Sequence, residues 1–238
     1  MKSIYSDELY QEVLGKMRER LNSGDRAEGI HLSDLSLCLN KYYLRNKHGE
    51  QRLGDDEVVL FGFGRTGEVW LRGSFDDAVP VQCEGIWCSV DHFGETMPWE
   101  IKVTKMSVNT PVPEHWLVQM MAYCYANWQT YGCREPESGK LTDALGDYCM
   151  FANVRMCVMG DYKKMRGITI VPEVLVFEEE EVMDNWMWLQ GRKEVLLSGV
   201  LPSSVIGDFE GRASTFNQCD KCLYEGFCPA SSKGMSKR

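Results

Sequence analysis

Two acidic residues and a lysine near the middle of the chain have the spacing of a catalytic group. Asp91 closes one predicted strand, and Glu100 and Lys102 lie on the next, which spans 97–103. Side chains at positions i and i+2 share a face of a strand, so Glu100 and Lys102 should point the same way. If the two strands form a hairpin, Asp91 comes to lie beside them.

These side chains suit a divalent cation. Two carboxylates that converge repel each other, and a cation between them relieves the repulsion. Hard oxygen ligands favour Mg²⁺ or Mn²⁺, which can polarise a phosphate, generate hydroxide and stabilise the departing oxygen. Lys102 would orient the attacking water or stabilise charge that develops on the phosphate. The alternative is a Glu–Lys pair on a surface strand, since this spacing is common by chance.

The helix predicted over 114–131 carries a polar stripe on an otherwise apolar surface. Gln119 and Tyr123 are one turn apart and share a face, and His115 precedes them on that face. The stripe predicts a pair that faces a metal or a phosphate beside the catalytic strand. The alternative is a helix edge at which a buried tyrosine finds a hydrogen bond.

Three cysteines near the C-terminus, Cys219, Cys222 and Cys228, have the spacing of a metal site. The Cys-x-x-Cys pair can hold one ion, or one edge of a cluster, from a tight turn. We expect Cys38, on a helix predicted over 33–45, to be the fourth ligand. Zinc and iron–sulfur clusters both bind thiolates, so the spacing favours neither. Either would join the end of the chain to its N-terminal helix and close a long loop.

Length and composition set limits on the class of protein. The chain has 238 residues, 44% hydrophobic and 26% charged, as in a soluble globular protein with a sizeable core. Without a bilayer-spanning stretch or a signal peptide, we expect a cytoplasmic protein with no membrane partner. In that reducing compartment, ten cysteines predict metal ligands and core residues in place of disulfides. The net charge of −9 argues against coating nucleic acid through bulk charge, but a nuclease can make local DNA contacts.

The hydrophobic periodicity predicts one α/β domain over 1–238. We expect a central mixed β-sheet flanked by helices, with a helical part over 1–58 and the core over 59–200. A cysteine-rich segment over 201–238 would form a cap that joins the N- and C-terminal segments. The expected elements are helices over 4–21, 33–45, 59–72, 114–131 and 178–197, strands over 79–90, 97–103, 147–158 and 168–177, and loops over 46–58 and 134–146.

Asp91 followed by Glu100-Ile101-Lys102 resembles the active-site motif of the RecB-type PD-(D/E)XK nucleases. The resemblance implies a restriction-endonuclease-like core. It implies that Asp91 and Glu100 are metal ligands, together with the backbone carbonyl of Ile101. Lys102 would be the catalytic lysine.

The same resemblance extends to the helix after the active strand, where Gln119 and Tyr123 match the family's motif. One element departs from the pattern. The family often has a histidine metal ligand on the helix before the core strands, and 59–78 contains no histidine. Glu68 stands where that residue would fall, and some relatives use a glutamate there. The alternative is an exposed helix residue.

The cysteines resemble those of AddB and of the CRISPR-associated RecB-type nucleases of the fourth Cas family. There, one N-terminal cysteine and a C-terminal Cys-x2-Cys-x5-Cys hold a [4Fe-4S] cluster, so the resemblance favours that cluster over Zn²⁺ here. It covers the chain from 31 to 229. It implies a Mg²⁺- or Mn²⁺-dependent deoxyribonuclease, an exonuclease on single-stranded DNA or DNA ends. Its expected role is CRISPR adaptation or recombination and repair, with a CRISPR integrase or recombination proteins as partners.

Two alternatives remain open. The chain could be a DNA-binding or complex-forming module with weak catalysis and a structural metal cluster, although the intact Asp91, Glu100 and Lys102 argue against decay. It could also be a zinc-stapled domain of unrelated function. Cleavage polarity, and exonuclease against endonuclease action, do not follow from the residues.

Overall fold

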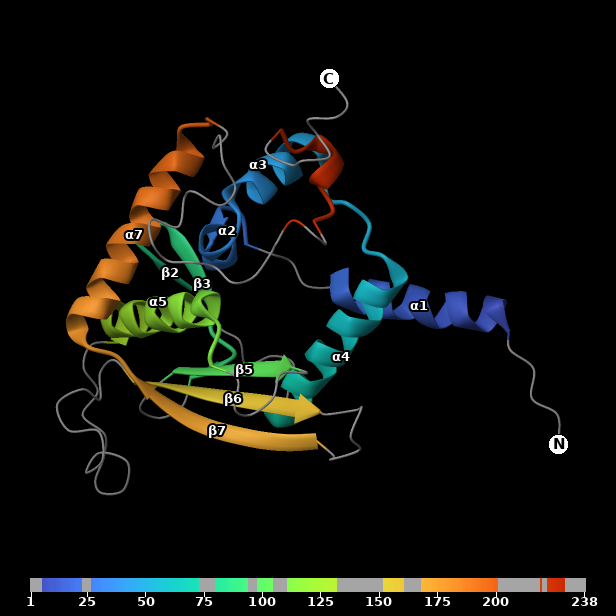
Figure 1. Ribbon diagram of the computed structural model, residues 1–238, viewed down its shortest axis with the longest axis horizontal. Coiled ribbons are helices and arrows are strands. Elements are labelled where there is room, and N and C mark those ends of the chain that lie inside the picture. Colours follow the sequence, from blue (N-terminus) through green and yellow to red (C-terminus); the bar gives the residue numbers. More distant parts are fainter. Residues whose placement is uncertain are drawn as a thin grey trace.

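The structure, a computed structural model, shows helices packed against two small β-sheets (Figure 1). The loop predicted over 134–146 and the start of the strand predicted from 147 lie outside the residues that it describes. The described residues are 6–22, 27–72, 80–93, 98–104, 111–131, 152–160, 168–200, 219 and 222–229.

The helices follow the predicted amphipathic segments closely at two places. The helix predicted over 114–131 is present as α5, and the acidic run before 182 opens α7, whose first turn has a capping box between Glu178 and Glu181. None of the helices in the described ranges combines the length and apolar character that crossing a membrane requires. The helices are α1 (Asp7–Asn22), α2 (Leu32–Ser36), α3 (Leu39–His48), α4 (Asp55–Arg72), α5 (Glu114–Tyr131), α7 (Glu179–Leu197) and the 3-10 helix η3 (Glu225–Phe227).

The single helix predicted over 33–45 was wrong, because the chain breaks between α2 and α3. Leu37 is extended, and Cys38 is the N-cap residue of α3 instead of lying within a helix. Arg192 of α7 explains the break. Its guanidinium donates to the carbonyl oxygens of Leu35, at 2.6 Å, and Leu37, which a continuing helix would have satisfied with its own N–H groups.

Helix α4 begins at Asp55, within the segment 46–58 that was predicted to be a loop. Asp55, Asp56 and Glu57 form its first turn, where carboxylates interact favourably with the helix dipole. The Glu57 side chain also accepts a hydrogen bond of 2.9 Å from the backbone N–H of Gly54. The polar residues taken for loop therefore start the helix.

The strands form two mixed sheets among the described residues, where one central sheet was expected. One has the order β1-β3-β2, with β1 (Ile30–His31) parallel to β3 (Ile86–Ser89) and β2 (Pro80–Cys83) antiparallel to it. The other has the order β4-β5-β6-β7, with β5 and β6 parallel and the outer pairs antiparallel. Its strands are β4 (His92–Phe93), β5 (Pro98–Thr104), β6 (Ala152–Gly160) and β7 (Ile168–Val176).

A tight turn explains why the strand predicted over 79–90 is two strands. Glu84 and Gly85 both have positive φ angles, 46° and 78°, which reverse the chain between β2 and β3. The two strands predicted over 79–90 and 97–103 are thus part of two hairpins, β2–β3 and β4–β5, that belong to different sheets.

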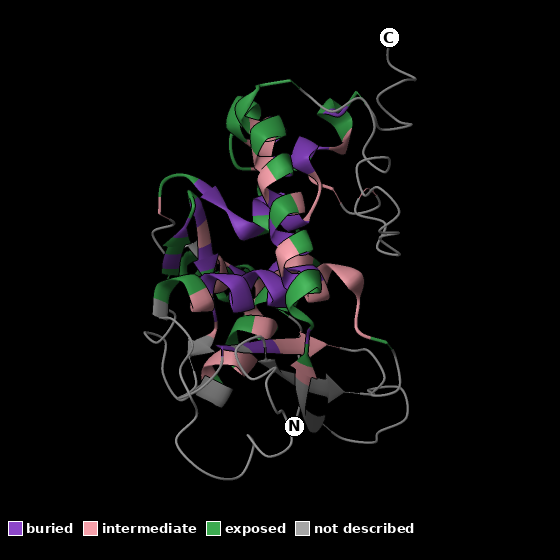
Figure 2. Ribbon diagram, turned by 90° about the vertical axis from the view of Figure 1, so that its left-hand side faces the viewer, coloured by how far each residue is buried: buried purple, intermediate pink, exposed green. Residues whose placement is uncertain are grey.

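Helix α5 is the centre of the core. It lies above β5 and β6 and beside α7 (Figure 1), and it also packs on β2 and β3. The buried residues concentrate at the centre of the fold (Figure 2). Tyr125 of α5 stacks on Trp186 of α7 with ring centroids 4.4 Å apart. The fully or nearly fully buried residues of α5 are Val118, Met120, Met121, Ala122, Tyr123, Cys124, Tyr125 and Ala126.

The Glu84 carboxylate ties the β2–β3 turn to both helices, since it accepts hydrogen bonds from Tyr125, Trp186 and Gln190 at 2.9, 2.9 and 3.1 Å. We expect Glu84→Ala to lower the free energy of unfolding by about 1–2 kcal/mol, because the indole and phenol donors lose their acceptor. Urea unfolding measures the change. Gln82→Ala, at an exposed position of β2, is the control and should stay within about 0.5 kcal/mol. Equal effects at both positions would contradict this role of Glu84.

Candidate active site

Strand β5 carries a buried ion pair. The Glu100 side chain is 3% exposed and the Lys102 side chain 19%, and the Lys102 ammonium donates to Glu100 Oε1. The two side chains lie on one face of the strand, as the i and i+2 spacing predicted, while Ile101 between them is buried in the other direction. The pair is therefore held away from bulk water.

Asp91 is fixed to the same strand. It lies between β3 and β4, where the chain passes from one sheet to the other, and its Oδ2 accepts a 2.7 Å hydrogen bond from the backbone N–H of Ile101. The β4–β5 hairpin brings Asp91 towards Glu100, as expected. The carboxylates of both Asp91 and Glu68, on α4, raise the pKa of Glu100, so both lie within electrostatic reach of it.

A chain of hydrogen bonds leads from Lys102 across α5. The Lys102 ammonium donates to Gln119 Oε1 at 3.1 Å, and Gln119 Nε2 donates to the Tyr123 hydroxyl at 2.7 Å. The Tyr123 hydroxyl donates in turn to the backbone carbonyl of Ser89 in β3, also at 2.7 Å. The chain links β5, α5 and β3, and the i and i+4 pair predicted from the sequence forms its middle.

Burial and neighbouring carboxylates dominate the electrostatics. Burial raises the pKa of Glu100 to about 8, Lys102 opposes that shift, and Asp91 and Glu68 add to it. Burial disfavours the ammonium of Lys102, but the surrounding carboxylates outweigh it and raise the pKa of that lysine. Three carboxylates thus surround one ammonium among the described side chains, and the site has a net affinity for positive charge.

One oxygen of the site is suited to bind a cation. Glu100 Oε2 is buried without a hydrogen-bond partner among the described residues. A buried carboxylate oxygen with no partner is costly, and a hard divalent ion would satisfy it. No three His, Cys, Asp or Glu side chains within the described ranges have the arrangement of a metal site as they stand. The donor types fit the ion, although Asp91 Oδ2 and Glu100 Oε1 bind protein donors here.

Two aromatic residues at the start of α5 complete the surroundings of the lysine. The Lys102 ammonium lies 5.8 Å from the ring centroid of Trp116, within range of a cation–π contact. Burial and the Lys102 charge lower the pKa of His115, which favours the neutral imidazole. Trp116 was not predicted as a site residue, although it lies one turn before Gln119 and that spacing could have identified it.

The cysteines at the two ends of the chain approach each other. Burial raises the pKa of Cys38, and the charges of Cys222 and Cys228 raise it further, so these three sulfurs share one neighbourhood. The backbone N–H of Cys222 donates to the carbonyl of Cys219 at 3.1 Å, which forms the expected turn. The buried Asn40 amide donates to Cys228 Sγ at 3.9 Å. Thiols are ligands that zinc and iron–sulfur clusters bind, although no three of the described cysteines have the arrangement of a metal site as they stand.

A small second core surrounds these cysteines. Leu44 of α3 packs with Tyr224 and Cys228, and the Tyr224 hydroxyl donates to the carbonyl of Gly49 at 3.0 Å. The rings of His48 and Phe227 stack with centroids 4.4 Å apart. Residues 222–229 are therefore packed on α3.

The fold and the site define a mixed α/β protein with a buried carboxylate–lysine pair at the centre. No family model matches the sequence, and no curated protein matches it. Among solved structures, the chain is similar to the crystal structure of SSO0001, with a TM-score of 0.52 and 15% identity. The similarity covers 94% of this chain and 97% of that one. At this identity it establishes the fold alone.

Three glycines of α4 allow a test of how closely this helix, which carries Glu68, packs on β5 and α1. A Cβ at Gly67 would lie 2.7 Å from the branched side chain of Val103 in β5, one at Gly62 would meet the flexible end of Met17, and one at Gly64 would meet nothing within 4 Å. We expect Gly67→Ala to destabilise the protein by about 1–3 kcal/mol, since a β-branched neighbour yields little.

Gly64→Ala is the control and should stabilise the protein by about 0.5–1 kcal/mol through the gain in helix propensity. Gly62→Ala should fall between the two. Urea unfolding measures all three variants. A stabilising Gly67→Ala would show that α4 does not rest closely on β5.

The cysteine site predicts a visible chromophore. If the thiols hold an iron–sulfur cluster, protein purified without oxygen should absorb near roughly 400 nm. Cys222→Ser should remove most of the band, and Cys83→Ala, at a buried thiol of β2, should leave it unchanged. Colourless protein that contains stoichiometric zinc would overturn the cluster in favour of a zinc site.

Proposed function

We propose that the protein is a metal-dependent DNA nuclease with a restriction-endonuclease-like core, which hydrolyses phosphodiester bonds in single-stranded DNA or at DNA ends. The observation that carries the proposal is the buried Glu100–Lys102 pair on β5, with Asp91 fixed beside it and Gln119 bonded to the lysine. A purely structural pair would not need two further carboxylates nearby.

The donor set suits a divalent ion and phosphate chemistry. Asp91, Glu100, the Ile101 carbonyl and Glu68 would hold Mg²⁺ or Mn²⁺, which supplies a polarised phosphate and a water of lowered pKa. The protein's own contribution is to position Lys102. Because Gln119 also binds its ammonium, the lysine can turn from Glu100 to a phosphate oxygen or the attacking water without losing every partner.

The roles of the remaining site residues follow from their positions. Tyr123 is buried and donates to the β3 backbone, so it holds Gln119 in place and does not itself face a substrate. The cysteine site, as a [4Fe-4S] cluster or zinc, would be structural, because it joins α3 to the C-terminal segment. A role in CRISPR adaptation or in recombination and repair, with an integrase or recombination proteins as partners, rests on the motif resemblance.

Cleavage of end-labelled DNA tests the proposal. Protein purified without oxygen is assayed on single- and double-stranded DNA with Mg²⁺, Mn²⁺ or EDTA. We expect metal-dependent cleavage, and Lys102→Ala and Glu100→Ala should each lower its rate by at least about a hundredfold, because each removes transition-state stabilisation. Lys16→Ala, at an exposed lysine of α1, should retain full activity.

Thermal unfolding separates loss of the ion from loss of the fold. Mn²⁺ should raise the melting temperature of the wild type, since an ion that binds the native state alone stabilises it. Glu100→Gln should abolish that shift and yet remain folded without metal. Well-folded protein that shows neither cleavage nor a Mn²⁺ shift would favour the alternative of a DNA-binding module without catalysis.

A further inference from the structure

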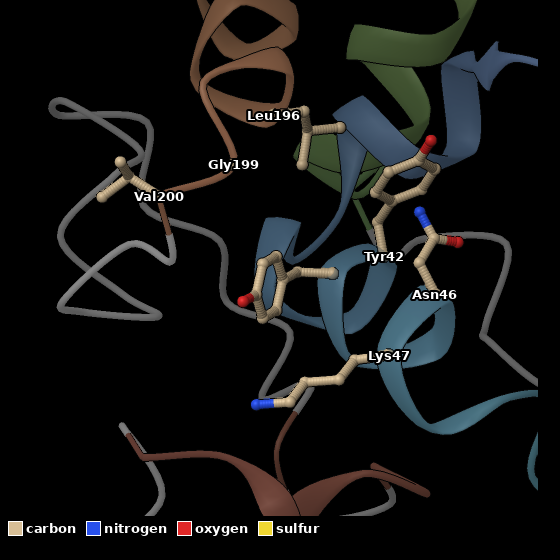
Figure 3. A pocket seen from close by; sticks show the side chains of 7 residues that line it. Tyr42, Asn46, Lys47, Leu196, Gly199 and Val200 are labelled. Carbon is tan, nitrogen blue, oxygen red and sulfur yellow. The ribbon is translucent and has the colours of Figure 1, made fainter.

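A hollow lies between α3 and the end of α7. It encloses 360 Å³ and is open on one side (Figure 3). In that view Tyr42 and Leu196 border it above, and the Lys47 side chain runs along its lower edge. The residues that line it are Tyr42, Tyr43, Asn46 and Lys47 of α3, Leu196 of α7, and Gly199 and Val200 just after α7.

The lining has the chemistry of a nucleotide site. Tyr42 and Tyr43 are partly exposed, and the Arg45 guanidinium lies 5.3 Å from the centroid of the Tyr42 ring. A base can stack on the ring surface that Arg45 and the core leave uncovered, and such stacking tolerates any base. Asn46 is exposed and can both donate to and accept from a base edge. Leu196 adds apolar surface. The volume is at the lower end of the range for small-molecule pockets, which suits one nucleotide.

The charge of the lining selects for an anion. Lys47 supplies the charge among the described lining residues, and its ammonium is exposed. Helix α3 contains no acidic residue, but Arg45 in its last turn forms ion pairs with Asp34 and Glu50 at 3.0 and 3.7 Å, so the charge at the hollow comes from Lys47. Because the chain carries a net charge of −9, a locally basic helix is a departure from its general character. The Lys47 ammonium would attract a phosphate to the hollow.

We propose that this hollow binds one unstacked nucleotide of a DNA single strand, with the base against the tyrosine rings and a phosphate at Lys47. The identity of the ligand rests on the proposed DNA substrate. The hollow would hold the strand at a point separate from the carboxylate site, as an anchor for DNA that the site cleaves. Its occupant is single-stranded, because a base paired in a duplex cannot present its face to the rings.

Fluorescence anisotropy with an end-labelled oligothymidylate of about 16 nucleotides, in EDTA, tests the anchor without cleavage. Tyr42→Leu combined with Tyr43→Leu keeps apolar bulk but removes both rings, and should weaken binding about tenfold or more. Replacement of both by phenylalanine keeps the rings and should restore affinity to within about threefold of the wild type. Double-stranded DNA should show no such dependence on the rings.

Lys47→Ala tests the phosphate contact through its salt dependence. Loss of one contact should reduce the slope of log affinity against log salt by about 0.7, as for single-stranded DNA. Lys41→Ala, at an exposed lysine of the same helix that does not line the hollow, is the matched control and should change the affinity less than about threefold. Equal effects of the two lysine variants would overturn the phosphate contact.

Photocrosslinking gives a readout that does not depend on a variant folding. An iodouracil-containing single strand, irradiated with the wild-type protein, should label the peptide that contains Tyr42 and Tyr43. Crosslinks confined to other peptides, or leucine variants that bind as the wild type does, would overturn the anchor even if DNA cleavage is observed. Protein that binds through the tyrosines but does not cleave would retain the anchor and overturn the nuclease.

Discussion

The Glu100 carboxyl group and the Lys102 ammonium meet on the same strand, where burial raises the pKa of Glu100 to about 8 and the ammonium opposes that rise. Removing one partner of such a buried pair typically costs about 3–5 kcal/mol, because the remaining charge is left uncompensated. The Lys102 ammonium has more N–H donors than Glu100 alone can accept from. Lys102 therefore reaches Gln119 on α5, and through Tyr123 the hydrogen bonds continue to β3. One buried charge pair thereby fixes the position of a helix against two sheets.

The position of Asp91 follows from the division of the strands into two sheets. The chain leaves β3 at Ser89 and enters the second sheet at His92, so Asp91 lies at the crossing. Its bond to the Ile101 N–H occupies a backbone donor of β5 at that point. Because Asp91 lies at the junction of the two sheets, its carboxylate can approach Glu100 from outside strand β5. The fold therefore brings two acidic groups together, and a cation between them would relieve their repulsion.

Arg192 of α7 sets the path of the chain between α2 and α3. Arg192 is buried, with its guanidinium also 4.7 Å from the ring of Trp188, and it holds the carbonyl groups at the end of α2. The resulting break directs the chain so that Cys38 begins α3 instead of continuing α2. Cys38 can then approach Cys222 and Cys228 from the start of a helix, while Leu44 further along α3 packs on Tyr224. Cys38 is thus positioned by a residue far from it in sequence.

The sequence by itself determined which residues share a face: period-two spacing paired Glu100 with Lys102, and helical spacing paired Gln119 with Tyr123. It also identified α5 and α7 and the turn of Cys219 and Cys222, because these features are local. Long-range contacts decided the rest. The break before Cys38 needs Arg192, which no local pattern around 33–45 could reveal. The division into two sheets depends on which strands pair across the fold. Trp116 lies at the site because the packing of α5 on β5 places its ring near Lys102.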